Sequence, residues 1–137
     1  SAFYHQFETD PLVVDKWFTL QATSPQAETL TEIETLMTHP DFTMRNPNRV
    51  RSLVGAFAQG NPVRFHDLSG AGYAFLADRV IELDTLNPQV AARMVAPLSR
   101  WRRYDSERQD MMKVQLERIQ RQENLSTDVG EIIEKSL

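Results

Sequence analysis

Four polar residues stand at positions from which they could bind a ligand. Arg49 and Arg51 lie about 100° to either side of an apolar helical stripe, so they border its buried face. Gln89 and Arg93 are four residues apart and therefore share one face of a helix, also beside an apolar stripe. Such positions suit a groove or a domain interface, and structural salt bridges are the alternative.

Residue types that carry catalysis or bind metals are sparse and scattered. The chain has three histidines that are far apart in sequence, His5, His39 and His66. None is followed by a second histidine at helical spacing, so the H-E-x-x-H zinc motif is missing. The carboxylate pairs Glu28 with Glu32 and Glu131 with Glu134 are typical of solvated helix faces. We expect no catalytic and no metal-binding residue.

The segment RWRRY, residues 100–104, interleaves cations with aromatic rings. This pattern could bind a nucleic acid, or it could be a helix C-terminus, where arginines complement the helix dipole. The net charge of -4 favours the second interpretation. The same charge argues against a protein whose main partner is a nucleic acid or an anionic membrane.

Length and composition are those of an ordinary helical or mixed globular domain. The 137 residues are 41% hydrophobic and 25% charged, which suffices for one core. Cysteine is absent, which suits a reducing compartment. No stretch approaches the ~20 apolar residues of a membrane span. The first ten residues lack the pattern of a signal peptide and resemble the second half of a helix.

Prolines mark the expected helix starts. Five of the seven follow a helix-capping residue, in the pairs Asp10–Pro11, Ser24–Pro25, Asn46–Pro47, Asn61–Pro62 and Asn87–Pro88. Pro11 and Pro47 are 36 residues apart, and Pro47 and Pro88 are 41 apart, close to the period of helical-pair repeats. No alternating strand pattern is present. The sequence predicts an all-α chain, built as a degenerate solenoid of helix pairs.

The expected helices cover residues 11–23, 25–38, 47–60, 62–66, 73–86, 88 onward, 106–123 and 127–137. Asp105 or Ser106 is expected to cap the helix that ends near residue 123, and Ser126 the last helix. The helix over residues 73–86 is expected to carry an apolar stripe of Tyr73, Leu76, Val80 and Leu83. Gly60 is expected to end the central helix in a left-handed conformation, and Pro97 to kink or shorten its helix. The first helix is expected to gather its apolar residues on one side, namely Leu12, Val13, Trp17 and Leu20. A second apolar set suggests an N-terminal face that expects neighbours: Phe3, Phe7, Val14 and Phe18.

Three long segments carry a family resemblance: AFYHQFETDPLVVDKWFTLQATSP, FTMRNPNRVRSLVGAFAQGNPVRFH and NPQVAARMVAPLSRWRRYDSERQ. They closely resemble the C-terminal end of bacterial aminopeptidase N, a gluzincin family of zinc-dependent alanyl aminopeptidases. The resemblance implies that residues 1–137 are a single helical domain, part of a right-handed α-α superhelix of HEAT/armadillo type. In that family the zinc ligands belong to another domain, so the chain itself would carry no zinc and no activity. The helical domain closes over the chamber in which N-terminal residues are removed.

The same resemblance suggests roles and partners. Arg51, within NPNRVRSL, would face the chamber, and Gln89 and Arg93, within NPQVAARM, would lie near the route of the peptide. The partners would be the catalytic and other domains of the same parent chain and its peptide substrates, in the cytoplasm. Two alternatives remain. One is a stand-alone helical-repeat adaptor with a partner in its groove, and the other is a nucleic-acid-binding domain that uses Arg100–Arg103.

Overall fold

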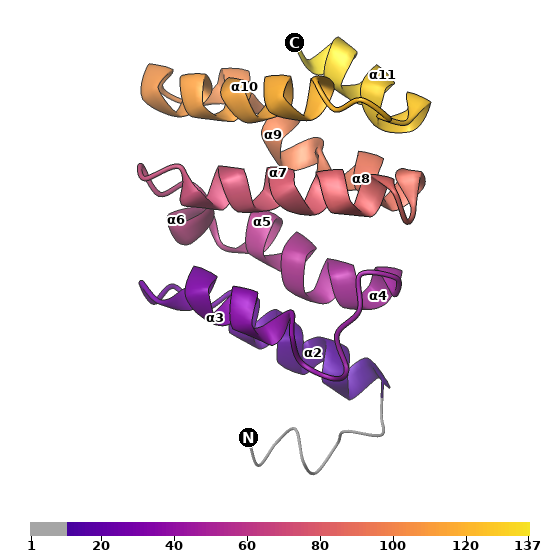
Figure 1. Cartoon of the computed structure of the whole chain (residues 1–137). Coiled ribbons are helices and arrows are strands. Elements are labelled where there is room, and N and C mark those ends of the chain that lie inside the picture. The colour runs from indigo at the N-terminus through magenta and orange to yellow at the C-terminus, as the bar shows by residue number, and fades with distance from the viewer. Residues whose placement is uncertain (1–10) are drawn as a thin grey trace. The chain divides into compact units, whose positions relative to one another are not determined.

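The computed structural model of the chain describes residues 11–137 (Figure 1). These residues form helices and turns without a strand among them, which confirms the all-α prediction. They divide into two compact units, the first ending at Arg64 and the second beginning at Phe65. Among residues 11–137 no helix combines the length and the apolar composition needed to cross a bilayer.

Unit 1 contains α2 (Pro11–Ala22), α3 (Thr29–Leu36), α4 (Pro47–Val50), η1 (Arg51–Gly55) and α5 (Ala56–Gly60). The short α6 (Pro62–Phe65) begins in this unit. Helix α2 packs against η1, α3 and α5. The core residues of this unit are fully buried or nearly so: Val14, Phe18, Ile33, Val50, Leu53, Val54 and Phe57.

The central helix starts as the sequence predicts, because the Asn46 side-chain oxygen accepts hydrogen bonds from the backbone N–H groups of Asn48 and Arg49. It runs without a break to Gly60, but η1 in its middle is a π-helix. The prediction that Gly60 adopts a left-handed conformation is wrong. Among the described residues only Gly70 has a positive φ, of 77°. At Gly60 an added Cβ would lie 3.1 Å from the Thr23 methyl, so the glycine permits a close approach there.

The apolar side predicted for α2 is not the side that faces the core of unit 1. Leu12 and Leu20 are 73% and 63% exposed, whereas Val14 and Phe18 are buried. Because α2 carries apolar residues around most of its circumference, periodicity alone could not choose the inward face. Val14 and Phe18, expected to await neighbours outside the chain, belong to the core of unit 1. Phe3 and Phe7 lie outside the described residues.

Helix α3 begins four residues later than predicted, because Ser24 does not cap it. The Ser24 carbonyl instead accepts hydrogen bonds from the Thr29 hydroxyl (2.8 Å) and the Asn61 side-chain amide (2.7 Å). These bonds hold residues 25–28 in a turn. A residue far along the chain thus overrides the local capping pattern. The proposed cap at Asp10 lies outside the described residues.

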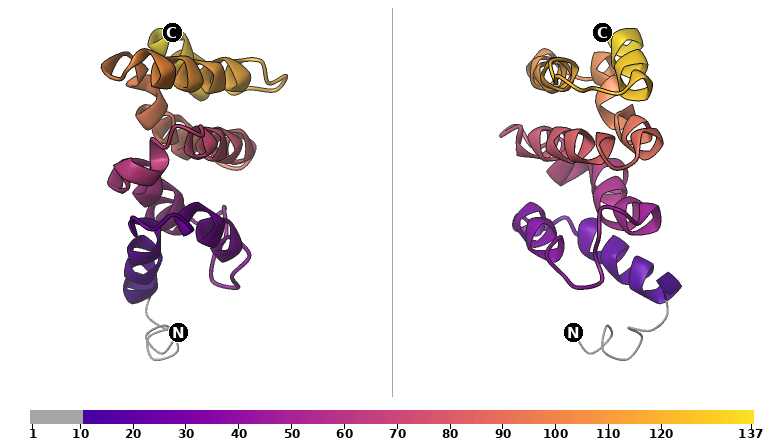
Figure 2. Two further views of the ribbon diagram at one scale, coloured as in Figure 1. Left: turned by 90° about the vertical axis from the view of Figure 1, so that its left-hand side faces the viewer. Right: turned by 45° about the vertical axis from the view of Figure 1, so that its right-hand side comes forward.

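Unit 2 contains α7 (Ala71–Asp84), α8 (Pro88–Met94), α9 (Ala96–Ser99), η2 (Trp101–Arg103), α10 (Ser106–Gln120) and α11 (Thr127–Ser136). Asn87, Asp105 and Ser126 cap α8, α10 and α11 as predicted. The helix that opens at Pro88 ends before Pro97, as expected for a residue without an N–H group. Helices α10 and α11, orange and yellow in Figure 2, lie side by side. The expected apolar stripe of α7 is completely buried: Tyr73, Leu76, Val80 and Leu83.

Candidate functional site

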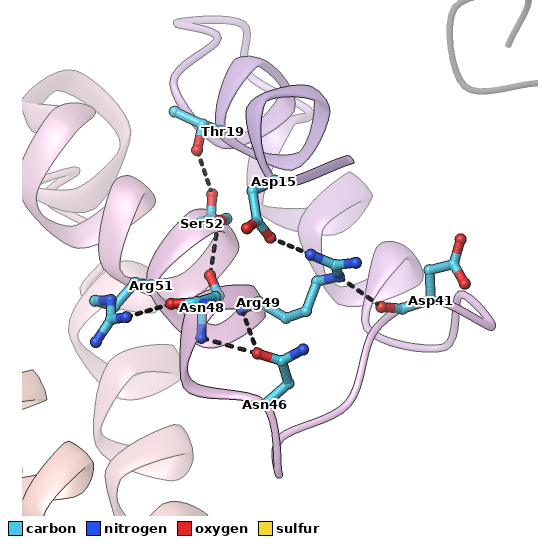
Figure 3. Close-up of polar contacts among 8 residues, drawn as sticks. All are labelled: Asp15, Thr19, Asp41, Asn46, Asn48, Arg49, Arg51 and Ser52. Carbon is cyan, nitrogen blue, oxygen red and sulfur yellow. Dashed lines mark hydrogen bonds and ion pairs between the residues drawn. The ribbon is translucent and has the colours of Figure 1, made fainter. Parts of the chain in front are cut away.

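Arg49 is part of the framework of unit 1 (Figure 3). It forms an ion pair with Asp15 of α2, in which the two side chains are only 11% and 18% exposed. Its Nε also donates a hydrogen bond to the Asp41 carbonyl at 3.0 Å. The guanidinium group therefore connects the start of the central helix to α2 and to the loop that precedes the central helix. For Arg49 the structural interpretation is confirmed.

Arg51, two residues later, is exposed and is the first residue of η1. Its guanidinium group donates to the Asn48 side-chain oxygen, one helical turn back. The neighbouring Ser52 hydroxyl donates to the Asn48 carbonyl at 2.7 Å. Unlike Arg49, Arg51 makes no ion pair within residues 11–137. Its head group is thus on the surface of unit 1 and accessible to a ligand.

Gln89 and Arg93 come together in unit 2, as their spacing predicts. With Ala92 they form the α8 side of a hollow of about 470 Å³ whose other side is α11. The α11 side chains are Asp128, Glu131, Ile132 and Lys135. We call this the α8–α11 hollow. Both charge signs and one aliphatic side chain line it, so it can accept charged and apolar groups of one ligand.

The side chains of Gln89 and Arg93 make no hydrogen bond or ion pair with any residue in the described part of the chain. Both are exposed. Their donors are therefore available to an external acceptor. Arg51 belongs to the other unit, unit 1.

The two described histidines have internal partners. The His39 Nδ1 accepts a hydrogen bond from the Asp41 N–H at 3.1 Å, and its ring centroid lies 5.8 Å from those of Trp17 and Phe18. Burial lowers the pKa of His39. Within residues 11–137 no group of three or more His, Cys, Asp or Glu side chains could hold a metal ion.

A second polar cluster, in unit 2, was not predicted from the sequence, because its residues come from three separate segments: His66, Tyr73 and residues 104–108. The His66 Nδ1 lies 2.7 Å from the Tyr73 hydroxyl, and the His66 ring stacks on Tyr104. The Arg108 Nε donates to the His66 carbonyl at 2.8 Å. Burial and, next, the charge of Arg108 lower the pKa of His66, whereas Asp105 opposes them. Burial raises the pKa of Tyr73 to about 12.

Side chains of the segment 100–104 bind the C-terminal end of helix α11. The Trp101 indole N–H donates to the Ser136 carbonyl at 2.9 Å, and Arg102 donates to the carbonyls of Ser136 and Leu137, each at 2.7 Å. Arg102 also stacks 4.3 Å above the Trp101 ring. These donors satisfy the C-terminal carbonyl groups of α11. The expected pairing of arginines with a helix C-terminus thus occurs, although on a different helix from the one that precedes the segment.

The sequence is similar to part of several known proteins. It is 52% identical to aminopeptidase N of Caulobacter vibrioides over 136 residues, which are 99% of this chain and 16% of that protein. It is 53% identical to aminopeptidase N of Haemophilus influenzae over 135 residues, which are 98% of this chain and 16% of that protein. The chain thus spans about 16% of the length of these relatives and matches their C-terminal region.

A solved structure is similar as well. The crystal structure of Legionella pneumophila aminopeptidase A in complex with aspartic acid matches 98% of this chain with 16% of its own, at 36% identity and a TM-score of 0.94. These similarities confirm the resemblance to aminopeptidases that the sequence segments indicate.

One family of domains matches along the whole length. Its description is "Domain of unknown function (DUF3458_C) ARM repeats", and the match covers residues 1–137. ARM repeats are stacked helix pairs, in agreement with the expected armadillo-like fold class. The chain belongs to the DUF3458_C family of ARM-repeat domains.

Proposed function

We propose that residues 1–137 act as a single, non-catalytic helical domain at the C-terminal end of a zinc-dependent alanyl aminopeptidase. The observation that carries this proposal is the identity of 52% to aminopeptidase N over 99% of the chain. The zinc ligands and the exopeptidase chemistry belong to other domains of the same polypeptide, which are the partners of this one. The parent enzyme removes N-terminal residues from peptides in the cytoplasm.

The role of the domain is to enclose the active-site chamber and to shape the access of peptides. Arg51, Gln89 and Arg93 contact the peptide along its path. Three features support these assignments. All three side chains are exposed, their head groups are hydrogen-bond donors, and the side chains of Gln89 and Arg93 have no partner within residues 11–137. A peptide offers the carbonyl and carboxylate oxygens that such donors bind.

The test is steady-state kinetics of the full-length enzyme with Arg51→Ala, Gln89→Ala and Arg93→Ala. Each variant is assayed with a longer peptide and with a small alanine-type chromogenic substrate. Loss of contacts made equally in the ground state and the transition state raises KM and leaves kcat unchanged. For each arginine variant we expect a KM about three- to tenfold higher for the longer peptide, and little change for the small substrate.

Arg121→Ala is the matched control, because Arg121 is another exposed arginine of unit 2 that lies outside the α8–α11 hollow. Equal kinetic constants for the control and the three variants would refute the role in peptide access. The alternative function, that of a stand-alone adaptor, predicts another result. If it were correct, removal of residues 1–137 from the full-length enzyme would leave the aminopeptidase activity and its dependence on peptide length unchanged.

A further inference from the structure

The turn that carries Arg51 departs from α-helical geometry. In η1 the Ala56 N–H bonds to the Arg51 carbonyl, five residues back, instead of four. Regular helix continues on both sides, in α4 and α5. Single π turns within α-helices are rare and occur frequently at functional sites. The π turn of η1 therefore marks residues 51–55 as a place where the helix geometry can serve a function.

The consequence concerns the direction of Arg51. In a regular α-helix the residues i, i+4 and i+7 share one face, so Arg51 would share its face with Gly55 and Ala58. Both are buried, whereas Arg51 is exposed. A π turn takes about one residue more than an α turn, which rotates the residues before it by roughly 100° relative to those after it. This rotation lets Arg51 leave the buried face.

The cause lies in the neighbouring helix. The Thr19 hydroxyl of α2 donates a hydrogen bond to the Ser52 carbonyl, within η1, at 3.1 Å (Figure 3). Helix α2 packs directly on η1, and Thr19 is half-buried in this contact. A side chain that inserts into the backbone hydrogen bonds of a helix is a recognised cause of local departures from α geometry. The Thr19 hydroxyl is such a side chain, because it donates a hydrogen bond to a backbone carbonyl of the turn.

We propose that Thr19 is a positioning residue for Arg51: its hydroxyl keeps residues 51–55 in the π register, and this register turns the Arg51 guanidinium to the solvent side. The register is a property of unit 1 alone. What Arg51 does there rests on the proposed function, so the two parts are tested by separate measurements.

The first measurement is backbone amide hydrogen exchange of the full-length protein. Thr19→Val replaces the hydroxyl with a methyl group of similar shape, and Thr19→Ser keeps the hydroxyl as the matched control. Loss of one hydrogen bond that holds the turn should make the amides of residues 52–56 exchange about fivefold faster in Thr19→Val. Thr19→Ser should exchange at nearly the wild-type rate, and α7 in unit 2 is an internal reference.

The second measurement is KM for a longer peptide, which a merely structural role would not change. Thr19→Val should raise KM as much as Arg51→Ala does, with kcat unchanged. The double variant should show no further increase, because both changes remove the same contact. Thr19→Ser should restore the wild-type KM.

Each outcome has a distinct meaning. Unchanged exchange at residues 52–56 in Thr19→Val overturns the proposal whatever the kinetics show. Faster exchange together with a KM that only Arg51→Ala raises overturns the positioning role of Thr19. Faster exchange with an unchanged KM in both variants leaves Thr19 in control of the register, but overturns the contact of Arg51 with peptide in the proposed function.

Discussion

Two arginines, one in each unit, differ in their surroundings although both lie beside an apolar stripe. In unit 1 Arg49 is enclosed between α2 and the loop before the central helix, and it pairs with Asp15. In unit 2 Arg93 lies in the open α8–α11 hollow, and no side chain within residues 11–137 pairs with it. Both arginines border an apolar stripe on their own helix. The difference is one of distance: the neighbouring helix places a carboxylate within ion-pair distance of Arg49, whereas Asp128 and Glu131 line the same hollow as Arg93 without forming an ion pair with it.

Arg49 and Arg93 thus represent two classes of arginine, those that stabilise the fold and those whose donors can bind a ligand. A half-buried arginine with a carboxylate partner stabilises the fold, because removing it leaves a poorly solvated charge behind. An exposed arginine without a partner contributes little to stability and is free to bind something else. Arg49 is expected to belong to the first class and Arg93 to the second.

The largest effect is expected at Arg49. Arg49→Ala leaves the Asp15 carboxylate half-buried without its cation, so we expect a loss of about 2 kcal/mol in the free energy of unfolding. Urea or thermal unfolding of the chain measures this loss. Arg51→Ala is the matched control, because Arg51 is exposed two residues away, and it should cost less than about 0.5 kcal/mol. Equal losses in the two variants would contradict the distinction.

Arg102 in unit 2 tests an intermediate case. Although exposed, it donates to the carbonyls of Ser136 and Leu137 and stacks on Trp101. We expect Arg102→Ala to lower the free energy of unfolding by about 1 kcal/mol and to speed amide exchange in the last turn of α11. Arg102→Lys keeps the charge but not the planar fork, and should recover only part of the loss. Arg103→Ala is the control, because no hydrogen bond of the Arg103 side chain exists within residues 11–137.

Among residues 11–137, each unit also carries a histidine whose pKa lies below its ordinary value, His39 in unit 1 and His66 in unit 2. The unfolded chain binds these protons near pH 6.5, whereas the folded chain resists them. The free energy of unfolding should therefore fall as the pH drops below about 6.5. Thermal unfolding between pH 8 and pH 5 measures the slope, and His39→Gln and His66→Gln should each flatten it. A melting temperature that rises on acidification would refute this assignment.

Local sequence signals predicted the helix starts at Asn46, Asn87, Asp105 and Ser126, because the capping oxygen and the backbone N–H donors that it accepts from lie within one turn of each other. The buried stripe of α7 was equally readable, since its apolar residues recur on one face only. These features depend on a few neighbouring residues, so no knowledge of the other helices is needed.

Features that depend on a second helix were not predictable in the same way. The amide of Asn61 holds the carbonyl of Ser24 and delays the start of α3. The hydroxyl of Thr19 accompanies the π turn that exposes Arg51. The spacing of Gln89 and Arg93 predicted their common face, but nothing in it indicated that Asp128 and Glu131 would face them. Only the packing of α8 against α11 brings these side chains together.

The smallest effects are expected in the α8–α11 hollow. Arg93→Ala and Gln89→Ala should each change the free energy of unfolding by less than about 0.5 kcal/mol, because no side-chain hydrogen bond or ion pair within the described chain is lost. Arg93→Glu sharpens the comparison, since it adds a third carboxylate beside Asp128 and Glu131. It should destabilise the chain by about 0.3 to 0.5 kcal/mol at low salt, and by less at high salt, where exposed charges are screened. If Arg93→Ala instead cost as much as Arg49→Ala, Arg93 would be a structural arginine, and its assignment to the peptide path would lose its main support.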